Sequence, residues 1–324
     1  MVLSVAVPES ESTSMVTDSS SNADSGRSPR ELPAVYLKGM AMGAADTVPG
    51  VSGGTIALVL GVYERLIEAL RSLTRPQLLR ALLARKWREV ARTGDLAFLG
   101  TLAAGILTSV FTLANLLGAL LADYPVFVFS FFFGLVAASV VPVATRIDRF
   151  ESGLLVAFVV GAAGTLLLLG LSPAQTPDAP WFVFISGALA ISALLLPGVS
   201  GAFLLVMLGK YEYALTAVSN LDILALLPLV LGIGFGLLTF AQVLGWLFRR
   251  YRNATLAVLS GVLLGSLRRV WPYQAQTGEG QSINVLPSAG AWSTPEGWAW
   301  ALLLAVAGAA IVLLLHRLER RGSD

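Results

Sequence analysis

The sequence contains no cysteine and only one histidine, and only 13% of its 324 residues are charged. The absence of cysteine excludes disulfides, thiolate metal sites and cysteine nucleophiles. The single histidine, His316, lies at the end of the last apolar run, so zinc chemistry and paired-histidine phosphatase chemistry are not expected. P-loop, HExxH and GxSxG motifs are also absent. We therefore predict that the protein is not an enzyme and uses no cofactor and no metal.

Long apolar runs are what the sequence has in place of these groups. It is 56% hydrophobic, with a mean hydropathy of +0.75, whereas soluble domains are about 25% charged. Several runs exceed the roughly 18 residues that mark a membrane-spanning helix. The net charge of +2 is too small to indicate a nucleic-acid partner. The composition predicts an all-α, polytopic integral membrane protein with membrane lipid as its surroundings.

One motif occurs twice in the chain. Residues 49–53 and 197–201 both read PGVSG, and the pattern Gly-x-Tyr-Glu follows each copy, at 61–64 and 209–212. A shift of 148 positions aligns the two motifs. Two helix-breaking motifs at corresponding places in two halves of a membrane protein are typical of a transporter's binding site.

The duplication extends beyond this motif. A shift of 127 positions aligns residues 105–139 with 232–266 without gaps, and glycines, a threonine, a tyrosine and a serine coincide. The two shifts differ by 21 residues, which corresponds to an insertion at the basic stretch 71–92. The shared order of two separate blocks predicts an internal repeat.

The apolar segments beside the motifs are too short to cross a membrane. The segment Tyr36–Val48 has 13 residues and would be about 20 Å long as a helix, against about 30 Å for the hydrocarbon core. Thr55–Leu70 is also short, and the same holds around Pro197. We therefore predict two re-entrant hairpins, each made of two half-helices. Six transmembrane helices are predicted elsewhere, at 96–121, 125–145, 152–171, 221–248, 254–270 and 297–315.

The positions of Lys and Arg predict the orientation of these segments. With both hairpins re-entrant, one face carries most of the basic residues, namely those in 71–92, Arg146, Arg149, Arg249, Arg250, Arg252, Arg317, Arg320 and Arg321. By the positive-inside rule that face is cytoplasmic. The first hairpin then enters from the cytoplasm and the second from outside, as in an inverted-topology repeat. We expect a multi-pass protein of the cytoplasmic membrane with both termini cytoplasmic; self-association as a homo-oligomer is left open.

This topology divides the chain into consecutive parts. They are a disordered N-terminal tail (1–33), a first repeat (34–150), a connecting span and outer loop (151–180), a second inverted repeat (181–272), an outer loop (273–296) and a final span with a basic tail (297–324). Within the first repeat, the spacing of Leu and Arg in 71–92, with Trp87, predicts an amphipathic helix on the membrane surface. A helix in a soluble loop is the alternative.

The predicted substrate site is formed by the tips of the two hairpins, which are the PGVSG turns at 49–53 and 197–201. Irregular backbone inside a membrane normally lines a hydrated cavity. Pro49 and Pro197 would break the first half-helix of each hairpin, and Gly50 and Gly198 would form the hinge of the turn. The second half-helices then begin with free N–H groups, which bind anions. The predicted anion ligands are Ser52, Gly53, Gly54, Thr55, Ser200 and Gly201. Tight helix packing by these glycines is the alternative.

Ionisable residues at membrane depth are candidates for function. Asp46 precedes the first tip, and its counterpart in the second half is Leu194, so we predict that its carboxylate binds a coupling proton or cation. Glu64 and Glu212 occupy matching positions; a coupling role and a structural role, such as pairing with Arg65, are both open. At the end of a span, Arg268 and Arg269 suit phosphate recognition, or they anchor the helix at the interface.

These motifs resemble the signature of the prokaryotic polyprenyl-phosphate transporter family. The resemblance covers nearly the whole chain beyond the tail; it is carried by residues 38–40, 45–57, 61–67, 196–201, 265–269 and 271–272. It implies a flippase that returns a lipid carrier such as undecaprenyl phosphate, as its monophosphate, from the outer to the inner leaflet, with proton or ion coupling. The long tail and the loop 273–296 depart from the family's usual outline. A secondary transporter of a small soluble anion is the alternative, and a lipid-phosphate enzyme is disfavoured because a nucleophile and base are missing.

Overall fold

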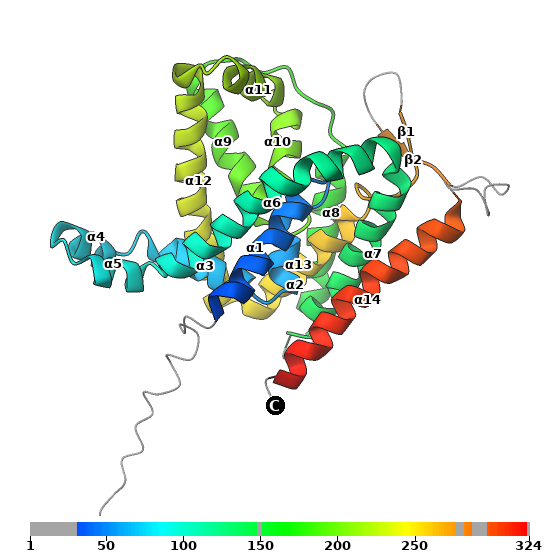
Figure 1. The fold of residues 1–324 in the computed structure, drawn as a ribbon, viewed down its shortest axis with the longest axis horizontal. Coiled ribbons are helices and arrows are strands. Elements are labelled where there is room, and N and C mark those ends of the chain that lie inside the picture. Colours follow the sequence, from blue (N-terminus) through cyan, green and yellow to red (C-terminus); the bar gives the residue numbers. More distant parts are fainter. Residues whose placement is uncertain (1–30, 148–150, 277–281, 287–296, 323–324) are drawn as a thin grey trace, which may run out of the picture.

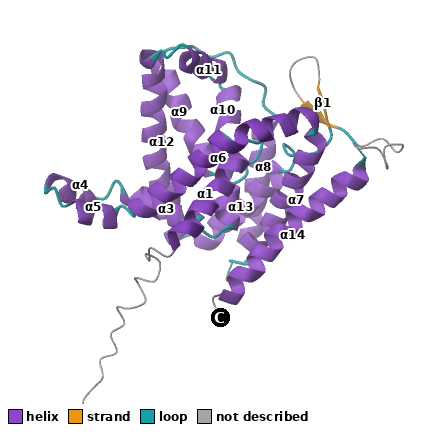
Figure 2. Cartoon of the chain, in the orientation of Figure 1, coloured by secondary structure: helices purple, strands orange, loops and turns teal. Residues whose placement is uncertain are grey.

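The computed structural model describes residues 31–147, 151–276, 282–286 and 297–322 (Figure 1). Most of the predicted disordered tail, residues 1–30, lies outside this range. The described chain is helical apart from one small β-hairpin in the predicted outer loop 273–296 (Figure 2). The elements are α1 (Leu32–Asp46), α2 (Gly53–Val59), α3 (Tyr63–Ser72), α4 (Pro76–Leu83), α5 (Trp87–Thr93), α6 (Leu96–Asp123), α7 (Pro125–Ala144), α8 (Ser152–Leu169), α9 (Pro180–Leu195), α10 (Gly201–Met207), α11 (Tyr211–Ser219), α12 (Ile223–Arg250), α13 (Arg252–Ser266), β1 (Gln274–Gln276), β2 (Ser282–Asn284) and α14 (Trp298–Gly322).

Among the described residues, five helices are long and apolar enough to cross a membrane: α6, α7, α8, α12 and α14. The predicted span 254–270 corresponds to α13, which has only 15 residues and packs against α7 and α8. Its length of about 22 Å is less than the hydrocarbon thickness. The bent pair α10–α11 would make a sixth crossing only if it counted as one span. The prediction of a helical, multi-pass membrane protein is confirmed.

The helices follow one another in two series of the same order. The first is α1, α2, α3, α6, α7 and α8, and the second runs from α9 to α14. Within each series the first helix packs on the fourth, α1 on α6 and α9 on α12. The last helices pair across the series, with α8 on α13 and α14 on α7. The two halves of the chain are therefore interlocked, and among the described elements α4, α5 and the β1–β2 hairpin have no counterpart.

Glycines permit the closest helix contacts, and they do so at matching positions. A Cβ on Gly39 of α1 would lie 2.3 Å from the Leu102 carbonyl oxygen of α6. A Cβ on Gly187 of α9 would lie 2.4 Å from the Leu229 carbonyl oxygen of α12. These residues are related by the same shifts of 148 and 127 positions that align the sequence. The repeat in the sequence therefore has a counterpart in helix packing.

We expect Gly134→Ala to destabilise the fold strongly. A Cβ at Gly134 of α7 would lie 1.8 Å from the Ala305 carbonyl oxygen of α14, so the two helices would have to separate. The expected loss is about 3 kcal/mol, the upper end for overpacking, measured by thermal unfolding in detergent. Gly164→Ala in α8 is the matched control, because a Cβ there meets nothing within 4 Å. Equal effects of the two substitutions would contradict this packing.

The second arm of each hairpin differs from the prediction. Thr55–Leu70 is not one helix, because the chain breaks between α2 and α3 at Gly61, which has φ +69°. The same break occurs at Gly209 (φ +62°), where α10 and α11 meet at 107°. Glycine tolerates positive φ without a Cβ clash. Each hairpin therefore contains a third helix, which turns away from the second.

The predicted single amphipathic helix over 71–92 is wrong. The segment forms two short helices, α4 and α5, separated at Arg85, which has φ +55°. Leu78 and Val90 form a small buried cluster of their own, because the two helices fold against each other. Trp87 is 66% exposed. The apolar residues of this segment therefore do not form one continuous stripe.

Basic residues from distant segments gather at one end of the molecule. Arg252 donates to the Arg146 carbonyl oxygen at 3.2 Å, and Arg249 lies 3.7 Å from the Glu68 carboxylate. His316, near the end of α14, lies 3.4 Å from the Thr145 hydroxyl. In Figure 1 this end is the lower side, and α11 and the β-hairpin lie at the upper side. The molecule thus has one strongly basic end.

Candidate functional site

A cavity of about 450 Å³ lies between the two PGVSG turns. It is lined by the ends of α1, α8 and α13, by α10, and by Ile283 of β2. The predicted site residues that line it are Asp46, Pro49, Gly50, Ser200, Arg268 and Arg269. Other lining residues include Thr47, Leu171, Phe203, Val206 and Tyr211, which are not among the predicted site residues. One space therefore brings together a carboxylate, two guanidinium groups and a wall of apolar side chains.

The two turns have the same backbone geometry. α1 ends at Asp46 and α9 at Leu195, in each case just before the motif proline. Gly50 has φ +89° and Gly198 has φ +86°. A residue with a Cβ would be strained in this conformation. Both predicted hinge glycines therefore occupy a position where the backbone itself requires glycine.

The first tip is already capped by the protein. The N–H of Gly53 donates to Asp46 Oδ1 at 2.6 Å, and the N–H of Gly54 donates to Ser52 Oγ at 3.1 Å. Ser52, Gly53, Gly54 and Thr55 are all buried and do not line the cavity. In this conformation Asp46 occupies the place at the start of α2 where an external anion was predicted.

Side chains of the first hairpin bind the backbone of the second turn. We call these contacts the inter-hairpin bond cluster. They supply partners for the Leu194 and Leu195 carbonyl groups at the end of α9 and for the Gly198 N–H, whereas the Leu196 carbonyl also accepts from the Val199 N–H at 3.3 Å. The bonds are the Tyr63 hydroxyl to the Leu195 carbonyl oxygen (2.8 Å) and the Gly198 N–H to Thr55 Oγ1 (2.9 Å). Ser52 Oγ, with its single proton, adds a long shared contact to the carbonyl oxygens of Leu194 (3.5 Å) and Leu196 (3.4 Å).

The second tip faces the cavity with only one of its two predicted ligands. Ser200 is half-buried and lines the cavity, and its side chain does not cap α10. Gly201 is buried and packs against α9, because a Cβ there would lie 2.6 Å from the Ala190 carbonyl oxygen. Ser200 is thus the hydroxyl of the second motif that a ligand in the cavity can reach.

The two arginines lie where the cavity meets the β-hairpin. The Arg269 guanidinium lies 5.5 Å from the centre of the Phe203 ring, within cation–π range. Its side chain also contacts the first turn, since a Cβ on Gly50 would lie 2.5 Å from Arg269 Cγ. The carbonyl oxygen of Arg268 accepts a bond from the Asn284 side chain at 2.9 Å. The β-hairpin therefore positions both arginines at one wall of the cavity.

A buried lysine holds the loop that forms another wall. Lys210 is 1% exposed and donates to Asp178 Oδ1 at 2.5 Å and to the Thr176 carbonyl oxygen at 3.0 Å. The Ala174 N–H donates to the Met207 carbonyl oxygen at 2.9 Å. These bonds fasten the loop after α8 onto the end of α10. They explain why this loop lies beside the cavity.

The two predicted coupling glutamates lie outside the cavity lining. Glu64 pairs with Arg252 at 3.0 Å, so the pairing with Arg65 is wrong. Arg65 instead binds Asp95 at 2.9 Å. Glu212 is exposed on α11, next to the cavity residue Tyr211. A coupling role for these two glutamates stays a prediction, whereas Asp46 shares a cavity with the arginines.

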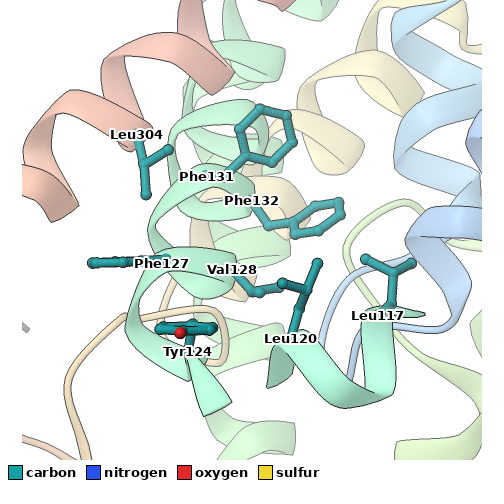
Figure 3. A pocket seen from close by; sticks show the side chains of 8 residues that line it. All are labelled: Leu117, Leu120, Tyr124, Phe127, Val128, Phe131, Phe132 and Leu304. Carbon is teal, nitrogen blue, oxygen red and sulfur yellow. The ribbon is translucent and has the colours of Figure 1, made fainter. Parts of the chain in front are cut away.

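A second groove of about 430 Å³ lies between α6, α7 and α14 (Figure 3). Its lining side chains are leucine, valine and phenylalanine apart from Tyr124, which supplies the single hydroxyl. It shares no lining residue with the polar cavity. This groove offers apolar surface but no charged group, so it is not the predicted anion site.

Comparison with known proteins identifies the family. The family model described as undecaprenyl phosphate translocase-like matches residues 42–284. The polyprenyl-phosphate transporter of Vibrio cholerae is 40% identical over 294 residues, which cover 87% of this chain and 95% of that protein. The polyprenyl-phosphate transporter of Staphylococcus aureus is 31% identical over 255 residues, covering 73% and 85% respectively. No solved structure matches. The chain belongs to the undecaprenyl phosphate translocase-like family.

Proposed function

We propose that this protein transports a polyprenyl monophosphate across the cytoplasmic membrane, from the outer to the inner leaflet, and so recycles a lipid carrier of the cell envelope. Two relatives bear the name polyprenyl-phosphate transporter. The observation that carries the proposal is the composition of the cavity. Arg268, Arg269 and the Ser200 hydroxyl suit a phosphate, and Leu171 and Phe203 in the same wall suit the first isoprene units.

The topology that we propose for this transport is an inverted repeat with two re-entrant hairpins. It is supported by the two helix series of equal order and by the matching turns at Gly50 and Gly198. The basic end, with Arg146, Arg249 and Arg252, is then cytoplasmic, and both termini lie on that side. The cavity, with Arg268 and Arg269, opens at the opposite end and receives the phosphate from outside.

Coupling to a proton or cation follows from the charges in the cavity. A phosphate that enters beside Arg269 shares the space with the Asp46 carboxylate. Two anions that share one cavity repel each other, so binding of one favours neutralisation of the other. Asp46 then takes up a proton or cation when the lipid phosphate binds. Cargo and coupling ion would therefore cross together.

The two alternative functions, transport of a small soluble anion and catalysis on a lipid phosphate, account for fewer of the groups that line the cavity. A small soluble anion needs the arginines but not the apolar wall formed by Leu171, Phe203 and Val206. A lipid-phosphate enzyme needs a nucleophile beside a base, and the described residues that line the cavity include no histidine or lysine next to Ser200. The apolar wall favours lipid transport over both.

The test is transport in reconstituted liposomes. We expect the protein to translocate a labelled polyprenyl phosphate and not to accumulate inorganic phosphate. Ser200→Ala should reduce the rate at subsaturating lipid about tenfold, because it removes a hydrogen bond to a charged group worth about 1.5–3 kcal/mol. Ser219→Ala is the control, since Ser219 is exposed on α11 and bonds only within its own helix. Uptake of inorganic phosphate without lipid movement would contradict the proposal.

A further inference from the structure

At three matching positions the two halves of the molecule are in opposite environments. The residues of the first hairpin that form the inter-hairpin bond cluster are each 0% exposed. The residues 148 positions later all line the open cavity, and Tyr211 is 41% exposed. The pairs are Ser52 and Ser200, Thr55 and Phe203, and Tyr63 and Tyr211.

We propose that the inter-hairpin bond cluster is a closed gate on the basic side of the molecule. In the alternative state this first gate opens, and the repeat-related residues Ser200 and Tyr211 close the opposite side as a second gate. This inference rests on the proposed transport function, and it identifies the residues that alternate. Tyr63 and Tyr211 are the central pair: the Tyr63 hydroxyl binds the tip of the second hairpin in this structure, and the Tyr211 hydroxyl would bind the tip of the first hairpin in the alternative state.

The partners of the second gate follow from the repeat. Tyr63 binds the carbonyl oxygen of Leu195, and the residue 148 positions before Leu195 is Thr47. Tyr211 and Thr47 already line the same cavity. In the alternative state the Tyr211 hydroxyl would therefore bind the Thr47 carbonyl oxygen and close the cavity.

When the first gate opens and the second closes, the buried backbone carbonyl groups still have hydrogen-bond partners. A carbonyl group that loses its side-chain partner must gain water or another donor, or the state is too costly to populate. In the alternative state the carbonyl groups at the end of α9 become exposed to water, while those at the end of α1 gain the hydroxyls of Ser200 and Tyr211. The two arrangements are thus close in free energy, as a two-state element requires.

The gates are not equally strong. Thr55 accepts a bond from the Gly198 N–H, but its counterpart Phe203 has no hydroxyl to offer Gly50. The second gate therefore has one hydrogen bond fewer than the first. The state closed on the basic side, as in this structure, is the one that the resting protein favours.

The absence of cysteine permits a direct test by single-cysteine labelling. Val59→Cys reports on the closed side, because Val59 of α2 is 3% exposed. Met207→Cys, 148 positions later, reports on the open cavity. With a water-soluble maleimide, we expect fast labelling of the Met207 variant and slow labelling of the Val59 variant in the purified full-length protein.

Two tyrosine substitutions should then change the labelling rate of the Val59→Cys variant in opposite directions. Tyr63→Phe removes one hydrogen bond of the closed gate and keeps its ring contact with Phe248, so Val59→Cys labelling should rise about fivefold. Tyr211→Phe weakens the second gate, so the same rate should fall about fivefold. Tyr36→Phe is the control, because its hydroxyl binds Thr108, far from the turns in sequence, and should leave the rate unchanged.

If the two tyrosine variants change the Val59→Cys labelling rate in the same direction, or if neither changes it, the proposed gate is wrong. Thr55→Val provides a second route if Tyr63→Phe does not fold, because it removes only the acceptor for Gly198 and should also raise Val59→Cys labelling. The labelling assay contains no polyprenyl phosphate. Opposite shifts together with failed lipid transport would therefore support the gate and refute the proposed cargo.

Discussion

Arg269→Ala is expected to raise the half-saturating concentration of polyprenyl phosphate about 10- to 100-fold. A charge-assisted hydrogen bond contributes about 1.5–3 kcal/mol, and the bidentate geometry of arginine suits a phosphate. Arg269 is half-buried between Phe203 and the turn at Gly50, so its charge is less screened than that of exposed Arg268. Arg268→Ala should therefore have a smaller effect. The measurement is transport in liposomes over a range of lipid concentrations.

Two further variants make this prediction specific. Arg269→Lys keeps the charge but loses the planar fork, so it should restore only part of the affinity. Arg88→Ala removes the same charge from an exposed position on α5 and should change nothing. Thermal unfolding of each variant separates loss of binding from loss of fold. An unchanged half-saturating concentration in Arg269→Ala would remove this residue from the phosphate site.

Much of the architecture could be predicted from local sequence signals. The apolar runs at 96–121 and 125–145 correspond closely to α6 and α7, because length and hydropathy alone identify such helices. The repeated PGVSG motif likewise predicts the proline and glycine of each turn. The breaks at Gly61 and Gly209 were missed, although their repetition at corresponding positions was a readable signal. Nothing in the local sequence indicated the break at Arg85, because a positive φ is uncommon for a residue other than glycine.

The candidate site was harder to predict, because tertiary contacts decide which groups remain available. A serine followed by glycine at the start of a helix predicts an anion site in either hairpin. Only the fold shows that Asp46 already fills this place in the first hairpin and that Ser52 and Thr55 are bonded to the second turn. A repeated sequence also cannot indicate which of its two halves is closed. The asymmetry between Tyr63 and Tyr211 is a property of the conformation.

Asp46→Asn is expected to uncouple transport from ion gradients while the fold survives. The Asp46 carboxylate accepts a 2.6 Å bond from the Gly53 N–H, and the asparagine carbonyl oxygen can accept the same bond. An amide cannot take up a proton or balance a cation, so an imposed proton or sodium gradient should no longer accelerate lipid movement. Exchange of lipid without a gradient should continue. The comparison is made in liposomes with each gradient imposed separately.

Three controls separate the charge of Asp46 from its hydrogen bond. Asp46→Ala removes both and should lower stability by about 1 kcal/mol, the typical value of a lost cap at a helix start. Gly53→Ala keeps the carboxylate but displaces it, because the new Cβ would lie 2.4 Å from Asp46 Oδ2; it should impair transport even though no charge is lost. Asp123→Asn, at an exposed helix end, should retain full coupling. If Asp46→Asn still responds to a gradient, the coupling ion must bind elsewhere, and Asp46 would then act only as the cap that holds the first tip closed.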